Sequence, residues 1–352
     1  MKNNSICICG GGSLGHVIAG VLSAKDSFEV TMLTRRKNLW QDHLEIVDCE
    51  NATTYKGKRI RVTDDPADVA ECGIVLLCLP GFLIKDELTR LKDHLTPGTP
   101  VGSVVSSTGF FFMAKNILDP ATPLFGYQRV PYIARPTEYG KSARILGRKK
   151  ELFVATLNMN NPEMIRELSE EMFDTPTDLL DNYLEASLTN SNPILHPARL
   201  YGLWHAWNPG IVYSEKAKFY EDWDVYSSDV LIALDDEFQR MIRKLPLDSS
   251  KIPPILAYYE SSDSRSLTRK IRSIAAFKCI EAPMRAMDGG WVPDFGNRYF
   301  IEDIPYGLMF IKALAAKFDI PAPTTDRVLS WAKKWMDPSD YENHIHLGDI
   351  EI

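Results

Sequence analysis

The feature that most constrains this chain is a glycine run that follows a short apolar segment near the N-terminus. Residues 5–9, SICIC, lead into Gly10-Gly11-Gly12-Ser13-Leu14-Gly15, and helical spacing follows over residues 16–24. A strand, then G-x-G-x-x-G, then a helix is the context in which this pattern indicates a dinucleotide-binding turn. A flexible glycine turn in another kind of α/β protein is the alternative interpretation.

Each position of this turn has a physical role in the predicted site. Gly10 permits the tight turn, Gly12 lets the backbone approach a pyrophosphate, and Gly15 lets helix and strand pack closely. The N-terminus of the following helix offers free backbone N–H groups and the positive end of its dipole to phosphates. We therefore predict that the cofactor is bound by Gly10, Gly12, Ser13, Leu14 and Gly15.

The end of the second predicted strand, over residues 28–35, bears on the choice of nicotinamide cofactor. An NAD-binding turn usually has Asp or Glu about 20 residues past the glycines, where it accepts from the ribose 2′-OH. This chain instead has Thr34-Arg35-Arg36. Because guanidinium groups offer paired donors to phosphate oxygens, these residues favour NADP(H), with NAD(H) as the alternative. Solvated surface arginines are the other interpretation of Arg35 and Arg36.

Patterns typical of strands and helices alternate through the first half of the chain, which indicates βαβ units and a parallel sheet. Three further elements are predicted: a buried strand over 73–80, a helix over 85–95 and a strand over 100–107. Residues 142–157 predict a β-hairpin whose second strand is apolar.

Two loops follow these strands at the edge where ligands bind in open α/β sheets. They are Pro80-Gly81-Phe82 and Ser106-Ser107-Thr108-Gly109-Phe110. We assign Pro80 to cofactor binding and Thr108 to substrate binding. Turns selected only for their geometry are the alternative.

The pattern changes after about residue 178, where long amphipathic stretches with three- and four-residue apolar spacing begin. A chain of 352 residues exceeds what one hydrophobic core usually serves. We therefore predict an α/β Rossmann domain over 1–178 and an all-α domain over 179–352.

Composition excludes several classes of partner. The net charge of −7 argues against nucleic acid or an anionic membrane surface, and no run of 18 apolar residues exists. The six cysteines contain no CxxC pair, which favours a reducing compartment and a cytoplasmic protein. No metal is predicted, because His344-x-His346 is too short and isolated a pattern. The oligomeric state is left open, with a homodimer among the options.

Three residues of the second half carry chemical interest. His196 stands in Asn192-Pro193-Ile194-Leu195-His196-Pro197, and by itself a lone histidine there is more often structural than catalytic. Arg298 and Asp303 stand in Asn297–Gly307, which by itself indicates an exposed loop leading into a helix, with Asp303 as a candidate N-terminal cap.

Together these segments resemble the opine dehydrogenase (octopine/nopaline dehydrogenase) family. The resemblance spans nearly the whole chain, and its most specific motifs are Asn192…His196-Pro197 and Arg298…Glu302-Asp303-Ile304-Pro305-Tyr306-Gly307. It implies a helical domain of the 6-phosphogluconate dehydrogenase C-terminal type. It also implies reductive condensation of an α-keto acid with an amino acid, bound as small-molecule substrates between the domains.

The resemblance also implies roles for individual residues. His196 and Asp303 match the family's catalytic pair, and Arg298 matches its substrate-binding arginine. Departures around Pro131 and Trp204 put the identity of the substrate in question more than the chemistry. Two alternatives stay open: an NADP-dependent keto-acid reductase of the hydroxyacid or ketopantoate type, and a protein that senses NADP(H) without turnover.

Overall fold

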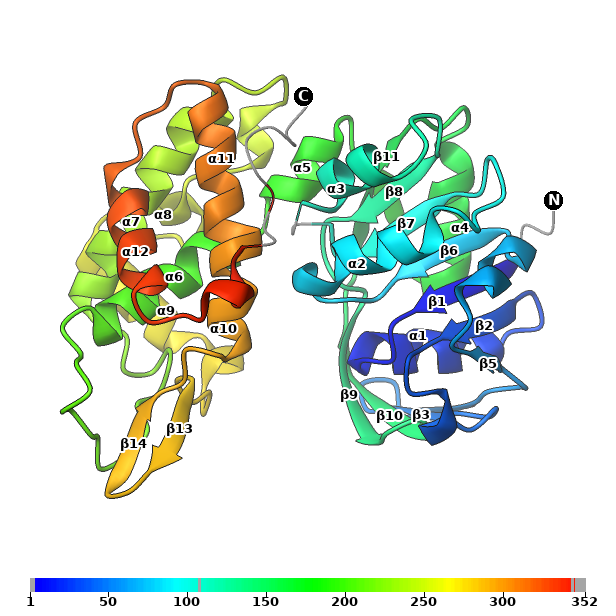
Figure 1. The fold of residues 1–352 in the computed structure, drawn as a ribbon, viewed down its shortest axis with the longest axis horizontal. Helices are drawn as coiled ribbons and strands as arrows, with labels where there is room; N and C mark the ends of the chain where they lie inside the picture. Colours follow the sequence, from blue (N-terminus) through cyan, green and yellow to red (C-terminus); the bar gives the residue numbers. More distant parts are fainter. Residues whose placement is uncertain (1–3, 107–108, 343–344, 346–352) are drawn as a thin grey trace. The chain divides into compact units, whose positions relative to one another are not determined.

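The computed structural model describes residues 4–106, 109–342 and 345. The chain forms two compact units, Met1–Ser187 and Leu188–Ile352 (Figure 1). Sheets dominate the first unit and helices the second. The predicted fold class, a Rossmann domain followed by a helical domain, is confirmed.

The first unit is built on a sheet that has eight strands among the described residues. In spatial order they are β12 (Thr177–Leu179), β11 (Leu152–Leu157), β8 (Leu124–Tyr127), β7 (Val101–Val104), β6 (Ile74–Leu77), β1 (Ser5–Cys9), β2 (Glu29–Leu33) and β5 (Arg61–Thr63). All neighbours are parallel except β11 and β8. From β1 the chain builds outward to β2 on one side and later to β6 on the other. The strand order therefore reverses next to β1, which is where open α/β sheets bind ligands.

Residues 142–157 do not form the predicted hairpin. β10 (Ser142–Arg148) joins a second sheet with β9 (Tyr132–Glu138), β3 (Glu45–Asp48) and β4 (Thr53–Lys56), whereas β11 pairs with β8 and β12 of the main sheet. The burial pattern explains the separation. β10 alternates between buried and exposed residues, as a strand with one wet face does, while β11 is largely buried. The buried Arg148–Asp48 ion pair, 2.7 Å long, further ties β10 to β3.

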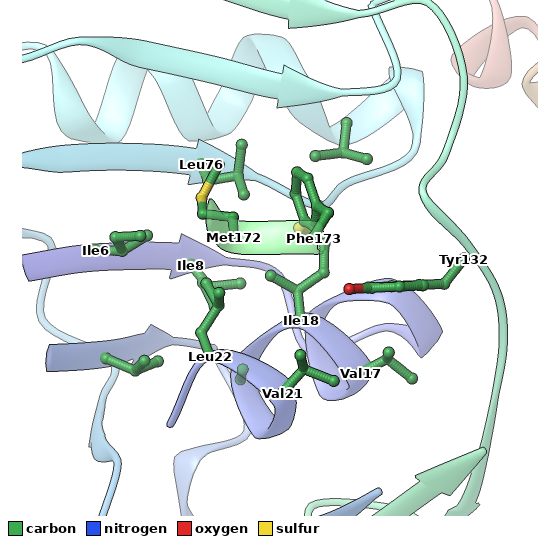
Figure 2. Close-up of a cluster of buried hydrophobic side chains, with 14 of the residues drawn as sticks. Ile6, Ile8, Val17, Ile18, Val21, Leu22, Leu76, Tyr132, Met172 and Phe173 are labelled. Atoms are coloured by element: carbon green, nitrogen blue, oxygen red, sulfur yellow. The ribbon is translucent and has the colours of Figure 1, made fainter. Parts of the chain in front are cut away.

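The core of the first unit lies between the sheet and its helices. The helices are α1 (Ser13–Ser23), α2 (Gly81–Leu91), α3 (Phe110–Ile117), α4 (Glu163–Phe173) and α5 (Tyr183–Leu188), with short turns η1 (Lys37–Leu39) and η2 (Pro66–Glu71). Ile6 and Ile8 of β1 face Ile18 and Leu22 of α1, while Phe173 of α4 closes the cluster (Figure 2). All five side chains are fully buried, so the strand and helix that flank the glycine turn are held rigidly.

The second unit is helical, with one hairpin that the sequence pattern did not predict. Its longer helices are α6 (Asn192–Trp204), α7 (Val225–Ile242), α9 (Ser264–Ser273), α11 (Met309–Lys317) and α12 (Pro323–Lys333). Shorter elements are η3 (Ser249–Lys251), α8 (Ile255–Tyr258), η4 (Ala275–Phe277), α10 (Arg298–Ile301), the π-helical turn η5 (Ile304–Leu308) and η6 (Pro338–Asp340). The hairpin pairs β13 (Met284–Met287) with β14 (Gly290–Pro293).

Candidate functional site

The glycine turn has the geometry that the motif predicts. Gly10 has φ +114°, and a side chain there would meet Leu79 and the Cys78 carbonyl of the loop after β6. A Cβ on Gly15 would lie 1.9 Å from the Gly10 carbonyl oxygen, so only glycine fits. Gly12 is exposed, and a Cβ there would have no heavy atom within 4 Å. The turn is therefore closed by its first and last glycines and open toward a ligand at Gly12.

Helix α1 begins at Ser13, directly after this open position. Its N-cap is Gly12, which has no side chain to accept from the first N–H groups, and no acidic residue lies in the first turn. These donors and the positive end of the helix dipole remain available to an anion. Ser13 and Leu14 are partly exposed at this end of the helix. A dinucleotide pyrophosphate fits the turn.

His16, one turn into α1, fastens the glycine turn to the second sheet. The Gly140 N–H donates to His16 Nε2 at 2.6 Å, so Nδ1 must carry the ring proton and donates to the Gly12 carbonyl at 2.8 Å. Burial lowers the pKa of His16, which favours this neutral form. The Trp40 and Tyr139 rings enclose the imidazole, with centroids 4.2 and 4.9 Å away. Sequence analysis did not single out His16.

The end of β2 exposes two cations beside the glycine turn. Thr34 is buried and its hydroxyl accepts from the Arg36 backbone N–H at 3.4 Å, while Arg35 and Arg36 are exposed. Arg36 lies 5.8 Å from the centroid of the Tyr139 ring. Among the described residues no carboxylate forms an ion pair with either arginine, in contrast to Lys37, which pairs with Asp64 at 2.6 Å. Both guanidinium groups are thus free to meet an anion.

Two predicted site residues of the first unit remain, Pro80 and Thr108, and the structure describes only Pro80. Pro80 is the N-cap of α2 at the carboxyl end of β6, the strand next to β1. Its neighbour Leu79 would contact a side chain at Gly10, so the two loops lie against each other. Thr108 lies outside the described residues, as do His344 and His346.

In the second unit a close approach of two helical segments brings the predicted dyad together. A Cβ on Gly307 of η5 would lie 3.0 Å from Cβ of Pro193 in the first turn of α6, so glycine permits the contact. The π-helical turn is marked by the bond from the Leu308 N–H to the Asp303 carbonyl. Such turns often occur at functional sites, where they aim a side chain away from the regular helical path.

His196 and Asp303 meet across this contact. His196 Nδ1 lies 2.9 Å from Asp303 Oδ2, and their side chains are 9% and 18% exposed. Because a carboxylate accepts, Nδ1 donates and carries the proton in the neutral ring. Asp303 does not cap a helix with its side chain, so the capping alternative is wrong, and Asn297 caps α10 instead. The structure joins two residues that stand 107 positions apart.

Arg298 stands at the start of α10, one turn before Asp303. Its side chain is 72% exposed and donates from Nε and Nη2 to Glu302 Oε2. None of its contacts with the described residues uses Nη1, so one edge of the fork remains available to a further carboxylate. The structure therefore shows a partly engaged guanidinium on the helical turn that precedes Asp303.

The second ring nitrogen of His196 also has a partner, which sequence analysis missed. His196 Nε2 lies 2.8 Å from the hydroxyl of Tyr220, a buried residue on the loop before α7. Burial raises the pKa of Tyr220 well above its usual range. The Tyr299 and Phe219 rings pack on the imidazole at centroid distances of 4.6 and 5.6 Å. No spacing or motif links residues 196 and 220, so only the fold reveals this contact.

Within the described part of the chain, no group of three or more His, Cys, Asp or Glu side chains could hold a metal ion. No helix of that part combines the length and the apolar character that crossing a bilayer would take.

Each half of the chain matches a known family. Residues 179–336 match the family described as NAD/NADP octopine/nopaline dehydrogenase, alpha-helical domain. Residues 6–106 match the family described as ketopantoate reductase PanE/ApbA. The helical match contains the His196–Asp303 dyad, and the other match contains the glycine turn and the two arginines.

Relatives that align with nearly the whole chain have names that agree with the family matched by residues 179–336. Octopine dehydrogenase of Mizuhopecten yessoensis is 28% identical, with 94% of this chain and 89% of that protein covered. Tauropine dehydrogenase of Arabella iricolor is 29% identical, with 94% and 91% covered.

Solved structures of octopine dehydrogenase are also similar to this chain. The complex with NADH and L-arginine has a TM-score of 0.82 at 27% identity, covering 94% of this chain and 89% of its own. The complex with NADH and pyruvate also has a TM-score of 0.82, at 26% identity, covering 94% and 88%. The similarity therefore extends over both units of the chain.

Proposed function

Because this chain belongs to the opine dehydrogenase family, we propose that it condenses an α-keto acid with the amino group of an amino acid and reduces the product. It is an NAD(P)-dependent oxidoreductase of the class that acts on CH–NH donors. The balanced reaction consumes a keto acid, an amine, NAD(P)H and one proton, and it yields a secondary amine, water and NAD(P)⁺. The bound cofactor supplies the hydride.

One observation carries the proposal for this chain: the hydrogen bond between His196 Nδ1 and Asp303 Oδ2. The carboxylate fixes the tautomer, leaves Nε2 as the exchangeable position and stabilises the imidazolium form. Imidazole titrates near neutrality, so such a pair suits general acid–base catalysis. Two proton transfers need it: the amine nitrogen loses a proton as its bond to carbon forms, and the keto oxygen gains protons before it leaves as water.

Arg298 is the residue we assign to the keto-acid carboxylate. The fork of a guanidinium matches a planar carboxylate, and its Nη1 edge is not engaged by the described residues. Glu302 holds the other edge and limits how the fork can turn. Arg298 binds the substrate in this proposal, while His196 and Asp303 handle the protons.

We further propose that NADP(H) is preferred over NAD(H). Gly10, Gly12, Ser13, Leu14, Gly15 and Pro80 would hold the dinucleotide, as they surround the open turn at the carboxyl ends of β1 and β6. Arg35 and Arg36 are exposed and unpaired among the described residues, where a 2′-phosphate would gain two guanidinium partners. An NAD-selective site would present a carboxylate to the ribose hydroxyls instead.

The experiment that tests the function is NADPH oxidation over a matrix of keto acids and amino acids. Pyruvate with L-arginine is the first pair, because both are bound in the octopine dehydrogenase structures. We expect turnover that requires both substrates. Turnover with a keto acid alone would instead indicate a keto-acid reductase, which the match of residues 6–106 to ketopantoate reductase makes the second candidate. Cofactor binding without turnover for any pair of substrates would instead indicate a protein that senses NADP(H).

A further inference from the structure

Both ring nitrogens of His196 have a hydrogen-bond partner within the second unit. Nδ1 is bonded to Asp303 and Nε2 to the Tyr220 hydroxyl. We propose, on the basis of the function proposed above, that Tyr220 is the catalytic proton relay through which His196 exchanges its proton with the substrate. Arg199 is the positioning residue that holds the Tyr220 loop in place.

The chemistry of a phenol allows this role. When His196 is neutral, the Tyr220 O–H donates to Nε2, and when the ring is protonated, Nε2–H donates to the Tyr220 oxygen. In the relay the Nε2–H bond breaks and that proton binds the Tyr220 oxygen. The original Tyr220 proton passes at the same time to the substrate oxygen, so Tyr220 starts and ends as a neutral phenol. The high pKa of the buried Tyr220 keeps it from resting as a phenolate.

The ring of Tyr220 is held so that its hydroxyl cannot easily leave Nε2. The ring stacks on Phe277 at 4.1 Å and 16°, and lies parallel to Trp223 at 6.3 Å and 5°. Tyr220 is 4% exposed. Stacking alone would be served by phenylalanine, so the hydroxyl is the part of this side chain that packing does not explain.

Arg199 places the loop that carries Tyr220. It lies three residues after His196 on α6, on the same side of the helix, and it is fully buried. Its guanidinium donates to the carbonyls of Lys218, Phe219 and Asp222, to Asp224 Oδ2 and to Ser227 Oγ.

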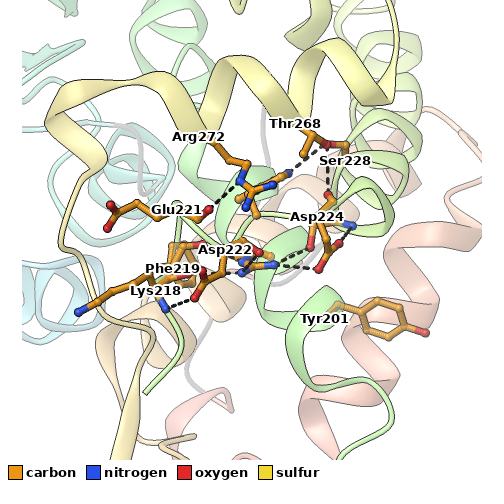
Figure 3. A network of polar contacts seen from close by, with 12 residues as sticks. Tyr201, Lys218, Phe219, Glu221, Asp222, Asp224, Ser228, Thr268 and Arg272 are labelled. Atoms are coloured by element: carbon orange, nitrogen blue, oxygen red, sulfur yellow. Dashed lines mark hydrogen bonds and ion pairs between the residues drawn. The ribbon is translucent and has the colours of Figure 1, made fainter. Parts of the chain in front are cut away.

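The loop from Lys218 to Asp224 thus closes around one side chain. Lys218, Phe219, Asp222 and Asp224 lie together in this network, while Tyr201 of α6 lies to one side of it (Figure 3). Burying a guanidinium is costly unless every donor is satisfied, and burial lowers the pKa of Arg199. Helix α6 therefore carries both the histidine and the clamp that brings the tyrosine to it.

Tyr220→Phe is the direct test, with Tyr201→Phe as the matched control that removes a hydroxyl elsewhere on the same unit. We expect kcat of Tyr220→Phe to fall by about 10- to 100-fold, below the full worth of a proton-transfer group because His196 Nε2, which then has no hydroxyl partner, can exchange one proton with the substrate directly. KM for the keto acid and the melting temperature should change little. The wild type should show a curved proton inventory in H₂O–D₂O mixtures, since two protons move together, and Tyr220→Phe a linear one.

A second pair of variants tests the positioning role. Asp224→Asn weakens the clamp at Arg199 Nη1 yet keeps an oxygen for the Ser227 N–H at the cap of α7. If Arg199 acts through Tyr220, Asp224→Asn lowers kcat in the wild type but not further in Tyr220→Phe. Additive losses would contradict that coupling.

The hydrogen bond itself is tested without turnover by ¹⁵N NMR of His196. Tyr220→Phe should shift the Nε2 resonance and leave Nδ1 nearly unchanged. Wild-type kcat and a curved inventory in Tyr220→Phe, or an unmoved Nε2 resonance, would overturn the relay. Absence of amine-dependent turnover in the wild type would contradict the proposed function instead, and the NMR result would still decide whether Tyr220 engages the histidine.

Discussion

His16 and His196 are both buried, and both ring nitrogens of each are hydrogen-bonded, yet their partners differ in kind. His16 bonds a backbone carbonyl and a backbone N–H, which can only accept and only donate. His196 bonds a carboxylate, which favours a charged ring, and a hydroxyl, which can donate or accept. Protonation of His16 therefore breaks a bond, whereas protonation of His196 breaks none.

This difference separates a structural histidine from an acid–base one without reference to motifs. The first unit uses a neutral imidazole to hold the glycine turn in shape. The second unit keeps an imidazole whose surroundings are satisfied in either charge state, as reversible proton transfer requires.

The largest effect is expected for His196→Ala. Removing a positioned proton-transfer group should cut kcat by about 10²- to 10⁴-fold, while cofactor affinity stays close to the wild-type value. His205→Ala, at the end of the same helix, is the matched control. Steady-state kinetics with cofactor titration would check this. Near-normal activity would mean that His196 has a structural role, as His16 does, and is not the acid–base residue.

Arg298→Ala should raise KM for the keto acid by roughly ten- to more than a hundredfold, because a charge-assisted contact contributes about 1.5–3 kcal/mol. Arg298→Lys should restore only part of the affinity, since a point charge does not reproduce the fork. Glu302→Gln separates the two partners of Arg298: it removes the internal ion pair but keeps an acceptor oxygen for the fork, so it should raise KM much less than Arg298→Ala does. If Arg298→Ala only lowers the melting temperature, with unchanged kinetics, the arginine serves Glu302 and not a substrate.

Asp303→Asn keeps the size of the side chain but removes the charge that favours the imidazolium. We expect kcat to fall by about tenfold, the lower end for a hydrogen bond to a charged group. Steady-state kinetics beside a thermal melt would check this, because a purely structural hydrogen bond would change the melting temperature alone. Wild-type kcat in a folded Asp303→Asn variant would mean that the carboxylate does not assist the histidine.

Cofactor selectivity is expected to depend on the end of β2. Arg35→Ala combined with Arg36→Ala should raise KM for NADPH about tenfold and leave NADH nearly unaffected, as exposed charges contribute less than buried ones. The ratio of kcat/KM for the two cofactors gives an internal control. Equal or better use of NADH by the wild type would contradict the NADP(H) preference.

The smallest effect concerns His16 and stability. Its folded-state pKa lies below the unfolded value, so the stabilisation is complete above about pH 6.5 and is lost as pH falls through the folded pKa. The slope there is at most about 1.4 kcal/mol per pH unit. His16→Gln keeps a donor and an acceptor but cannot titrate, so thermal melts should show a flatter acid limb. An unchanged limb would place the acid sensitivity elsewhere.

Sequence patterns correctly predicted those parts of the fold that are determined by interactions between residues close together in the chain. The strand, glycine turn and helix around Gly10 are specified by adjacent residues, and the change from alternating strands and helices to amphipathic helices indicated the two architectures. The prediction of a hairpin over residues 142–157 was wrong. Two strands that are adjacent in sequence were expected to pair, but their different burial places β10 and β11 in different sheets.

The helical site depended on contacts far apart in sequence. His196 and Asp303 were connected by family resemblance, since no spacing rule relates residues on α6 and η5. Tyr220 and Arg199 were not predicted at all, because an aromatic residue in an acidic loop and an arginine in an apolar helix carry no motif. An arginine in an apolar helix could have indicated such a contact. If its guanidinium is buried, several hydrogen-bond acceptors must lie nearby to offset the cost of burying the charge.

The most direct test of the account is identification of the product formed from a keto acid, a ¹⁵N-labelled amino acid and NADPH deuterated at the transferred position. Reductive condensation predicts one product per NADPH consumed, with the deuterium and the ¹⁵N bonded to the same carbon. A deuterated hydroxy acid without nitrogen would contradict the proposed function.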